Sequence, residues 1–412
     1  MPPIRFIHAA DLHLDAAFSG LSRDIPADFA ERLRTATFTT FRRLLDLCER
    51  ESPDFLLLAG DVYNQEDASV SAQLALRDGF RRLESLSIPV FLVHGNHDPL
   101  ASRLRSVRWP GNVTVFGELP DAVPVFRKGE GTPLAIIHGA SHASGRETRN
   151  LAALFRRTEA CGLHVGLLHA TPGDADGVAR YAPFSQGDLK ASGMDYWALG
   201  HIHDRREVCR EPLAAYPGCT QGLHINEPGE KGCLLVTAEA RPDGGYAVRT
   251  SFRPLGPAVW KTLDMDLGGA ASLDELENRL RTGLDRAAAE VWSGCEMLLV
   301  RLRLQGRTEL DGLLRKGTTC AELADRLRED GSGVPRIWIK DIDVATRPCV
   351  ERGALLERED LLGEVFRLSE AARTAWSGCL EALLREWESA RAENAEVVRL
   401  RARSEEQAVE VR

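Results

Sequence analysis

Side chains that could bind metal ions recur at five places in the first half of the sequence. They are Asp11 with His13, Asp61, Asn96 with His97, His169, and His201 with His203. Carboxylate and imidazole groups suit Mn, Fe or Zn, and the absence of cysteine from these motifs argues against a site for a soft metal. One Asp-x-His pair is weak evidence because such pairs occur by chance, but five motifs in one chain indicate a shared centre.

These residue types predict the hydrolysis of a phosphodiester. Near neutral pH that reaction needs a deprotonated water and stabilisation of the charge on the entering and leaving oxygens. Two divalent metal ions about 3.5–4 Å apart provide both. A carboxylate that bridges the two ions sets their spacing, so the motifs indicate a two-metal phosphoesterase.

Short apolar runs alternate with amphipathic stretches up to about residue 255, which predicts α/β architecture. We expect strands at residues 5–10, 55–59, 90–93, 134–138, 164–168 and 196–199, and helices near residues 28–51, 70–86 and 148–160. Each of the five motifs lies at the end of a predicted strand. Because α/β sheets build their sites from loops at the carboxyl ends of strands, the five motifs should converge in space.

The rest of the chain predicts further units. Residues 205–254 are rich in predicted strands, which suggests a second sheet packed on the first. From about residue 258 the pattern predicts a small α+β unit, in which Ser272-x-x-Glu275 is a capping box that opens a helix. After Arg347-Pro348 apolar residues at helical spacing predict a helical tail. The expected units are residues 1–255, 256–347 and 348–412.

The composition, 43% hydrophobic and 27% charged, is that of a globular protein. No apolar run reaches the roughly 18 residues of a membrane helix, and the N-terminus lacks the pattern of a signal peptide. We therefore expect a cytoplasmic protein with no membrane partner. The nine cysteines include no C-x-x-C pair, which argues against a disulfide framework and against a structural zinc site.

The net charge of -9 is unlike the basic surface of most nucleic-acid-binding proteins. Four pairs of adjacent arginines could nevertheless line a groove: Arg42-Arg43, Arg81-Arg82, Arg156-Arg157 and Arg205-Arg206. For any single pair, a place on a solvated helix face is the better interpretation. Divalent metal ions would also neutralise part of the acidic charge locally.

The order Asp-x-His, Gly-Asp, Gly-Asn-His-Asp, His and Gly-His-x-His resembles the calcineurin-like metallophosphoesterase superfamily over about the first 205 residues. The resemblance implies a two-sheet sandwich flanked by helices, and a role for each motif. One metal ion would be held by Asp11, His13, Asp61 and His203, and the other by Asp61, Asn96, His169 and His201. Asp61 would therefore bridge the two ions. His97 would be the catalytic histidine that donates a proton or a hydrogen bond to the leaving oxygen, and Asp98 would orient the His97 ring.

Within that superfamily the sequence is similar to the SbcD-type DNA repair exonucleases, especially the YhaO-like branch. The similarity lies in Tyr216-Pro217-Gly218-Cys219-Thr220-Gln221-Gly222-Leu223-His224-Ile225-Asn226-Glu227 and in Lys231-Gly232-Cys233. The α+β unit resembles the capping domain with which such nucleases hold DNA. This similarity implies a DNA exonuclease with endonuclease activity that uses two Mn ions, with Fe, Zn or Mg as the alternatives.

The same resemblance implies a protein partner. The C-terminal helices of SbcD-type nucleases dock on the coiled coil of an SMC-like, SbcC-type ATPase, and the apolar stripe of the tail fits a partner helix. A helical hairpin that packs on itself is an equally good interpretation of the tail. Whether the chain forms a homodimer stays open.

Two residues are candidates for binding the substrate. In some relatives a histidine at the position of Asn64 contacts the substrate phosphate, and Asn64 departs from that pattern. His224 could touch the substrate or stabilise a loop. Three other histidines, His8, His94 and His138, are better interpreted as structural.

Two other functions fit the same motifs. One is a small-molecule phosphodiesterase or phosphatase, which a closed pocket in place of an open groove would favour. The other is an architectural subunit of an SMC-like ATPase complex with residual or no catalysis.

Overall fold

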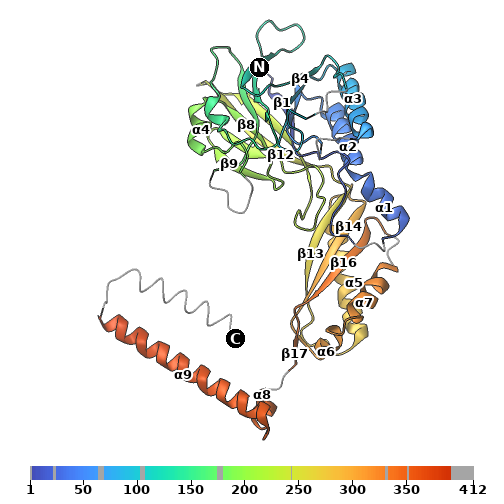
Figure 1. Cartoon of the computed structure of the whole chain (residues 1–412), viewed down its shortest axis with the longest axis vertical. Helices are drawn as coiled ribbons and strands as arrows, with labels where there is room; N and C mark the ends of the chain where they lie inside the picture. Colours follow the sequence, from blue (N-terminus) through green and yellow to red (C-terminus); the bar gives the residue numbers. More distant parts are fainter. Residues whose placement is uncertain are drawn as a thin grey trace.

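The computed structural model describes residues 2–21, 25–63, 69–102, 107–173, 180–242, 244–329, 333–349 and 352–390. Figure 1 shows a larger body built from the N-terminal part of the chain, a smaller body beyond it, and a long helix that leads away from the smaller body. All nine cysteines are free in the structure. No helix among the described residues is long and apolar enough to span a bilayer.

The first sheet of the larger body contains six strands in the order β12-β11-β1-β2-β3-β4. They are β1 (Ile4–Ala9), β2 (Phe55–Ala59), β3 (Val90–Val93), β4 (Val113–Val115), β11 (Gly232–Ala240) and β12 (Tyr246–Pro254). Strands β1 to β4 run parallel to one another, and β11 is antiparallel to β1. The carboxyl ends of β1, β2 and β3 therefore lie at one edge, as the motif spacing predicts.

The second sheet contains six strands in the order β5-β6-β7-β8-β10-β9. They are β5 (Asp121–Val125), β6 (Ala135–Ala140), β7 (Leu163–His169), β8 (Tyr196–Gly200), β9 (Arg206–Arg210) and β10 (Leu213–Tyr216). A second sheet packs on the first, as expected, but the strands of residues 205–254 are divided between the two sheets. Strands β9 and β10 extend the sheet that already holds β8, while β11 and β12 pair with β1.

The two sheets pack face to face through aromatic and aliphatic side chains. The rings of Phe6 and Phe55 stack at 4.7 Å between centroids, and Tyr196 of the opposite sheet meets Phe6 edge-on at 5.5 Å. Helices α2 (Ala36–Glu51) and α3 (Val70–Ser85) cover the outer face of the first sheet. Helix α4 (Gln186–Ala191) and the short 3-10 helix Ala152–Leu154 cover the second. This arrangement confirms the two-sheet sandwich flanked by helices.

Two of the expected helices differ from the structure. The helix expected near residues 28–51 is divided at Thr35 into α1 (Ala27–Arg34) and α2. The hydroxyl of Thr35 bonds the carbonyls of Glu31 and Arg32 at this junction. The helix expected near residues 148–160 is wrong. After one 3-10 turn the chain is extended at Phe155, and the N–H of Arg157 bonds the carbonyl of Ser192 instead of continuing a helix.

The smaller body has a three-stranded parallel sheet in the order β13-β14-β16. Its elements are β13 (Ala258–Asp266), α5 (Leu273–Glu290), β14 (Met297–Gln305), β15 (Arg307–Thr308), α6 (Asp311–Leu314), α7 (Thr319–Glu329), β16 (Arg336–Val344) and β17 (Arg347–Pro348). The hydroxyl of Ser272 accepts the N–H of Glu275, as expected of the residue that opens α5. Helices α5 and α7 bury one face of the sheet in a leucine-rich core.

An aromatic cluster joins the two bodies. Phe29 and Leu33 of α1 pack with Trp260 of β13 and Trp338 of β16. The rings of Phe29 and Trp338 lie 5.7 Å apart, and Phe18 lies 6.2 Å from Trp260. Because these side chains are mostly buried, the smaller body is packed directly against the sandwich.

The C-terminal part consists of α8 (Arg352–Leu356) and α9 (Leu361–Ala390), which confirms a helical tail as far as the described residues reach. The final stretch from Glu393 lies outside them. Apolar side chains are exposed along α9: Leu361, Leu362, Val365, Leu368, Trp376 and Leu383. Figure 1 shows this helix lying apart from both bodies.

Packing between β7 and β8 gives a test of the fold. A Cβ added at Gly166 would lie 2.6 Å from Cε3 of Trp197, whose side chain is fully buried. We expect Gly166→Ala to lower the free energy of unfolding by about 1–3 kcal/mol, because a buried ring has nowhere to move. Urea denaturation followed by tryptophan fluorescence measures this, with Gly117→Ala as control, since a Cβ at Gly117 would meet nothing within 4 Å. Equal midpoints for the two variants would contradict the described packing.

Candidate metal centre

The loops after β1 and β2 are fastened to each other by backbone hydrogen bonds. The N–H groups of Asp11 and His13 donate to the carbonyls of Gly60 and Asp61 at 3.1 and 3.0 Å. Asp11, His13, Asp61 and His201 have φ values of 51°, 42°, 49° and 102°. Non-glycine residues rarely adopt this left-handed region, and holding one there costs on the order of 1–3 kcal/mol. The surrounding fold therefore imposes the conformation of these residues.

The first cluster of candidate ligands contains Asp11, His13 and His203, whose donor atoms all lie within 4.8 Å of one another. Nδ1 of His203 donates to Glu227 at 2.5 Å, which leaves Nε2 as the atom with a free lone pair. That Nε2 lies 3.1 Å from Nε2 of His13. At this distance either the N–H of one ring or a metal ion must lie between the two nitrogens.

The second cluster contains Asp61, His169 and His201. Nδ1 of His169 donates to the carbonyl of Ala59 at 2.9 Å, so its Nε2 points into the cluster. There Nε2 lies 3.3 Å from Oδ2 of Asp61 and 3.1 Å from Oδ1 of Asn96. Oδ1 of Asn96 also lies 3.2 Å from Nδ1 of His201. The sequence-predicted residues of this group are thus brought together.

Asp61 lies between the two clusters. Its Oδ2 is 3.3 Å from Nε2 of His169 in the second cluster and 4.0 Å from Nε2 of His13 in the first. The other carboxylate oxygen, Oδ1, accepts the N–H of His97 at 2.9 Å. One oxygen that faces both clusters is the geometry that a bridging ligand needs.

The charges at the centre are strongly coupled. Burial lowers the pKa of the His169 imidazole, but the Asp61 carboxylate outweighs this effect and raises that pKa to about 9. Burial opposes the ionisation of Asp61, but the charge of His169 holds the pKa of its carboxyl well below the usual range. Burial also raises the pKa of Asp11 to about 6 and lowers that of His13 to about 3.

These residues fit a pair of divalent metal ions. Nε2 of His169 and Oδ2 of Asp61 are both acceptor atoms when the imidazole is neutral, and they lie 3.3 Å apart. A proton or a metal ion must therefore lie between them. Carboxylate, amide and imidazole donors in two adjoining clusters match the ligands that Mn, Fe and Zn prefer. The residues that could hold metal ions are Asp11, His13, Asp61, His169, His201 and His203, with Asn96 in contact with the second cluster.

Three glycines let other groups approach His169 and Asp61 closely. A Cβ at Gly60 would lie 2.4 Å from Nδ1 of His169, and a Cβ at Gly95 would lie 2.2 Å from Oδ1 of Asp61. A Cβ at Gly200 would lie 1.7 Å from the carbonyl oxygen of Ala59. Of the three, only Gly60 has a positive φ, at 88°. Close approach, more than turning of the chain, is thus what requires glycine here.

The two residues predicted to be catalytic have different surroundings. His97 is exposed, and its ring lies edge-on to that of His13 with 5.0 Å between centroids. Asp98 is fully buried, and its oxygens accept the N–H groups of Gly95 at 2.8 Å and Val62 at 3.0 Å. Asp98 therefore ties the loop after β2 to the loop after β3. That it also orients the His97 ring stays a prediction.

The two residues predicted to bind substrate lie apart from the clusters or outside the described residues. Asn64 belongs to the residues that are not described. Nδ1 of His224 accepts the N–H of Asn226 at 3.2 Å, which agrees with the loop-stabilising alternative. A Cβ at Gly20 would lie 3.4 Å from Nε2 of His224 and 3.6 Å from Cε of Lys340, so His224 stands where the sandwich meets the smaller body.

Three residues of the centre were not singled out by the sequence. His142 is fully buried and its Nε2 lies 2.6 Å from the carbonyl oxygen of His169. The ring of Tyr181 lies 5.2 Å from that of His201. Glu227 bonds the ring of His203. Of the three, only Glu227 could have been found from the sequence, because it lies in the Gln-Gly-x-His-Ile-Asn-Glu segment that resembles the YhaO-like branch.

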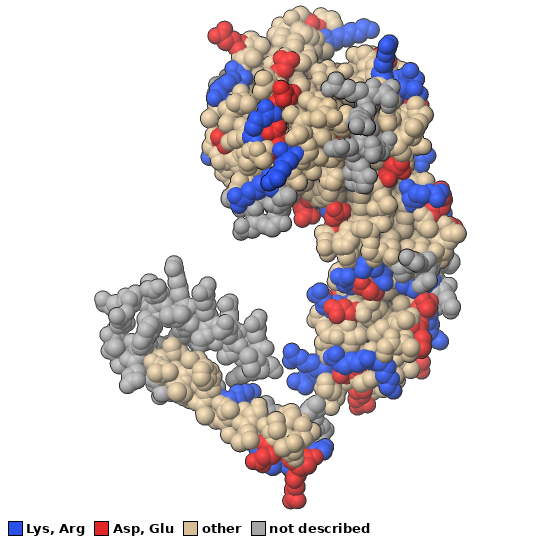
Figure 2. Space-filling model, in the orientation of Figure 1, with Lys and Arg blue, Asp and Glu red and all other residues tan. Residues whose placement is uncertain are grey.

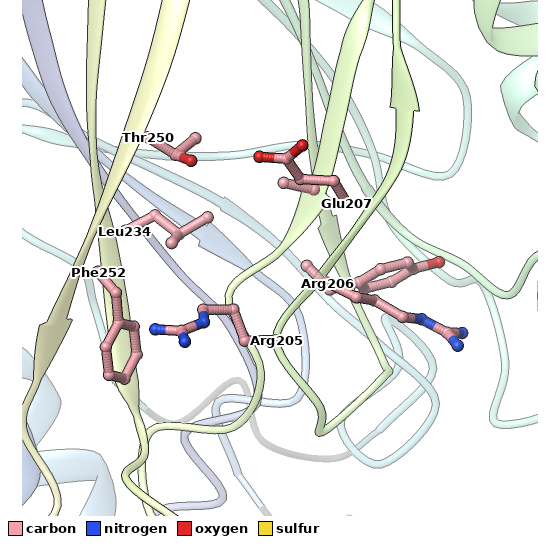
Figure 3. Close-up of a pocket in the computed structure, with 8 residues that line it drawn as sticks. Arg205, Arg206, Glu207, Leu234, Thr250 and Phe252 are labelled. Carbon is pink, nitrogen blue, oxygen red and sulfur yellow. The ribbon is translucent and has the colours of Figure 1, made fainter.

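The arginine pairs have mixed surroundings. Arg43, Arg82 and Arg157 are held in ion pairs, whereas Arg205 and Arg206 line a pocket of about 280 Å³. In that pocket, between β9–β10 and β11–β12, the guanidinium of Arg205 lies 4.0 Å from the centre of the Phe252 ring (Figure 3). Basic and acidic side chains are interspersed over the face of the molecule in Figure 2.

Comparisons with known proteins agree with this geometry. The sequence model of the calcineurin-like phosphoesterases matches residues 4–205, and that of the middle domain of the metallophosphoesterase YhaO matches residues 260–347. An uncharacterized metallophosphoesterase, YhaO of Bacillus subtilis (strain 168), is 35% identical over 387 residues, which cover 93% of this chain and 90% of that protein. The DNA double-strand break repair protein Mre11 of Aeropyrum pernix is 28% identical over 320 residues, which cover 71% of this chain and 69% of that protein.

The position of Asp61 between the clusters predicts how metal binding depends on it. We expect Asp61→Asn to bind neither ion tightly, because an amide that replaces the carboxylate removes a negative charge from both clusters at once. Metal analysis after loading with Mn and gel filtration measures the effect, with Asp195→Asn as control. Asp195 bonds Arg157 and the N–H of His164 instead of a candidate ligand, so that variant should load like the wild type. One ion retained by Asp61→Asn would contradict the bridging position.

Proposed function

The chain belongs to the calcineurin-like phosphoesterases, close to YhaO, and we propose that it is a two-metal nuclease that hydrolyses the phosphodiester backbone of DNA. The observation that carries the proposal is the carboxylate oxygen of Asp61, which faces both clusters of candidate ligands. We take the metal to be Mn, with Fe, Zn or Mg as the alternatives. The division of the ligands into two sets around Asp61 is part of the proposal.

The reaction draws on both the ions and the side chains. When bound, two divalent metal ions supply a deprotonated water and stabilise the charge that develops on the phosphate. Asp61 fixes the backbone of His97 through its Oδ1, which holds the histidine beside the centre. The ring of His97 is exposed beside the centre, where it can donate a proton or a hydrogen bond to the leaving oxygen. Asp98 keeps the loop of His97 in place by bonding Gly95 and Val62.

Three observations support DNA as the substrate. A relative that aligns with 71% of the chain is a DNA double-strand break repair protein. The smaller body, which matches the middle domain of YhaO, packs directly on the sandwich. His97 is exposed, so a substrate much larger than the centre can reach it. We propose that the smaller body helps to hold the DNA.

Incubation of the purified protein with end-labelled duplex and single-stranded DNA in the presence of Mn tests the substrate. Progressive shortening of the labelled strands is the expected result. The Asp61→Asn variant, purified in parallel, controls for a contaminating nuclease. Rapid hydrolysis of bis-p-nitrophenyl phosphate with intact DNA would overturn the nuclease and favour a small-molecule phosphodiesterase.

The role of His97 predicts a separation between metal binding and turnover. His97→Ala should retain the metal content of the wild type, because the ring is not among the proposed ligands. It should lower the rate of DNA cleavage by about 10²–10⁴-fold, the usual contribution of a proton donor. Metal analysis and single-turnover kinetics on the same preparation check both parts. Loss of metal in this variant would show that His97 is a ligand instead.

We further propose that α9 is the docking helix for an SMC-like ATPase. At 100° per residue the exposed apolar residues of α9 fall on one face of the helix, with Leu361 80% and Trp376 73% exposed. Such a stripe is the usual contact face of a helix in a coiled coil or bundle.

Charges placed on this stripe should prevent the association. We expect Leu368→Glu with Trp376→Glu to abolish co-purification with a co-expressed coiled-coil ATPase but to leave bis-p-nitrophenyl phosphate hydrolysis unchanged. Thr374→Glu is the matched control, because at 100° per residue Thr374 lies on the opposite face of α9. Co-purification that survives the double substitution would rule out this face.

A further inference from the structure

A carboxylate stands directly behind one of the candidate metal ligands. Oε1 of Glu227 accepts a hydrogen bond from Nδ1 of His203 at 2.5 Å. We propose that Glu227 is a positioning residue, which fixes the ring of His203 and strengthens its bond to the metal ion of the first cluster. The inference rests on the proposed two-metal function and assigns a role to a residue outside the ligand set.

The hydrogen bond decides which nitrogen of His203 is available. A carboxylate can only accept, so the proton of the neutral imidazole stays on Nδ1 and the lone pair of Nε2 is left free. Nε2 lies 3.1 Å from Nε2 of His13, inside the first cluster. Glu227 thus selects the tautomer that a metal ion needs and aims it at the cluster.

Glu227 is itself held in place. Its second oxygen, Oε2, accepts the N–H of Leu223 at 2.7 Å, and its own N–H donates to the carbonyl of His224 at 2.9 Å. The side chain is 21% exposed. Because both oxygens are engaged, the carboxylate cannot rotate away from the ring without breaking a second bond.

Residues of the segment 218–231 also contact the backbone of His203. Nζ of Lys231 is buried and donates to the carbonyl of His203 at 2.9 Å and to Oδ1 of Asp204 at 3.3 Å. Gly218 also approaches this carbonyl closely, because a Cβ at Gly218 would lie 2.7 Å from the same oxygen. Residues 218–231 therefore fix His203 at both its ring and its main chain.

His169, the buried histidine of the second cluster, is oriented differently. Its Nδ1 donates to a neutral backbone carbonyl, that of Ala59. An ionised carboxylate makes the attached imidazole a stronger base and a better metal ligand than a carbonyl does, and the loss of such a partner commonly costs 10–100-fold in metal affinity. The effect of Glu227 should consequently fall on the first cluster more than on the second.

Calorimetric titration of Mn into the metal-depleted full-length protein tests the proposal without measuring activity. In Glu227→Ala we expect one of the two Mn affinities to fall by about 10–100-fold while the other stays within about threefold of the wild type. Glu227→Gln keeps an acceptor but removes the charge, so its loss should be smaller. The melting temperature of the metal-free protein should change little in either variant.

Cys219→Ala is the matched control. The thiol of Cys219 lies in a cluster with His203 and Glu227 and is buried, so this variant also removes atoms beside the histidine. It removes no carboxylate, and both Mn affinities should stay at the wild-type values. A loss in Cys219→Ala as large as that in Glu227→Ala would assign the effect to packing and overturn the proposal.

The remaining outcomes separate this inference from the proposed function. Wild-type affinities in Glu227→Ala, or an equal fall at both sites together with a lower melting temperature, would overturn the positioning role but leave the two-metal centre intact. A wild-type protein that binds none of Mn, Fe, Zn and Mg would overturn the proposed function, and the inference with it. The wild-type titration alone therefore shows which of the two has failed.

Discussion

The burial of Asp61 beside His169 is the constraint on which the rest of the centre depends. Two ionisable groups with almost no exposure are stable only when opposite charge and hydrogen bonds replace the lost water. The structure meets this demand by bringing strand ends from both sheets to one point. The carbonyl of Ala59 accepts a hydrogen bond from Nδ1 of His169, and three glycines leave the space that this packing requires. Sheet pairing, loop conformation and ligand placement are thus all needed to bury Asp61 beside His169.

Much of the site could be predicted because its residues sit where strand periodicity ends. Each of Asp11, Asp61 and Asn96 follows a buried parallel strand, His169 is the last residue of β7, and His201 follows β8. Parallel strands with both faces covered are continuous apolar runs, so their ends are visible in the sequence. The convergence of the motifs then follows from the geometry of the sheet.

The rest depends on contacts that no local pattern encodes. The partition of the region after His203 between two sheets is decided by which edge each strand meets: β10 pairs with β8, and β11 pairs with β1. The hydrogen bond between His203 and Glu227 spans 24 residues and depends on how residues 218–231 fold over the loop. The helix expected near residues 148–160 fails because the backbone of Arg157 finds a partner in Ser192, far along the chain.

The left-handed backbone at Asp11, His13, Asp61 and His201 links the stability of the protein to its surroundings. The fold holds these four residues in an unfavourable conformation. An ion that binds only the folded chain stabilises it by mass action, and the stabilisation grows with the logarithm of the free ion concentration. The lifetime of the protein in a cell would then follow the supply of metal ions, and starvation for metal would speed its turnover by proteases.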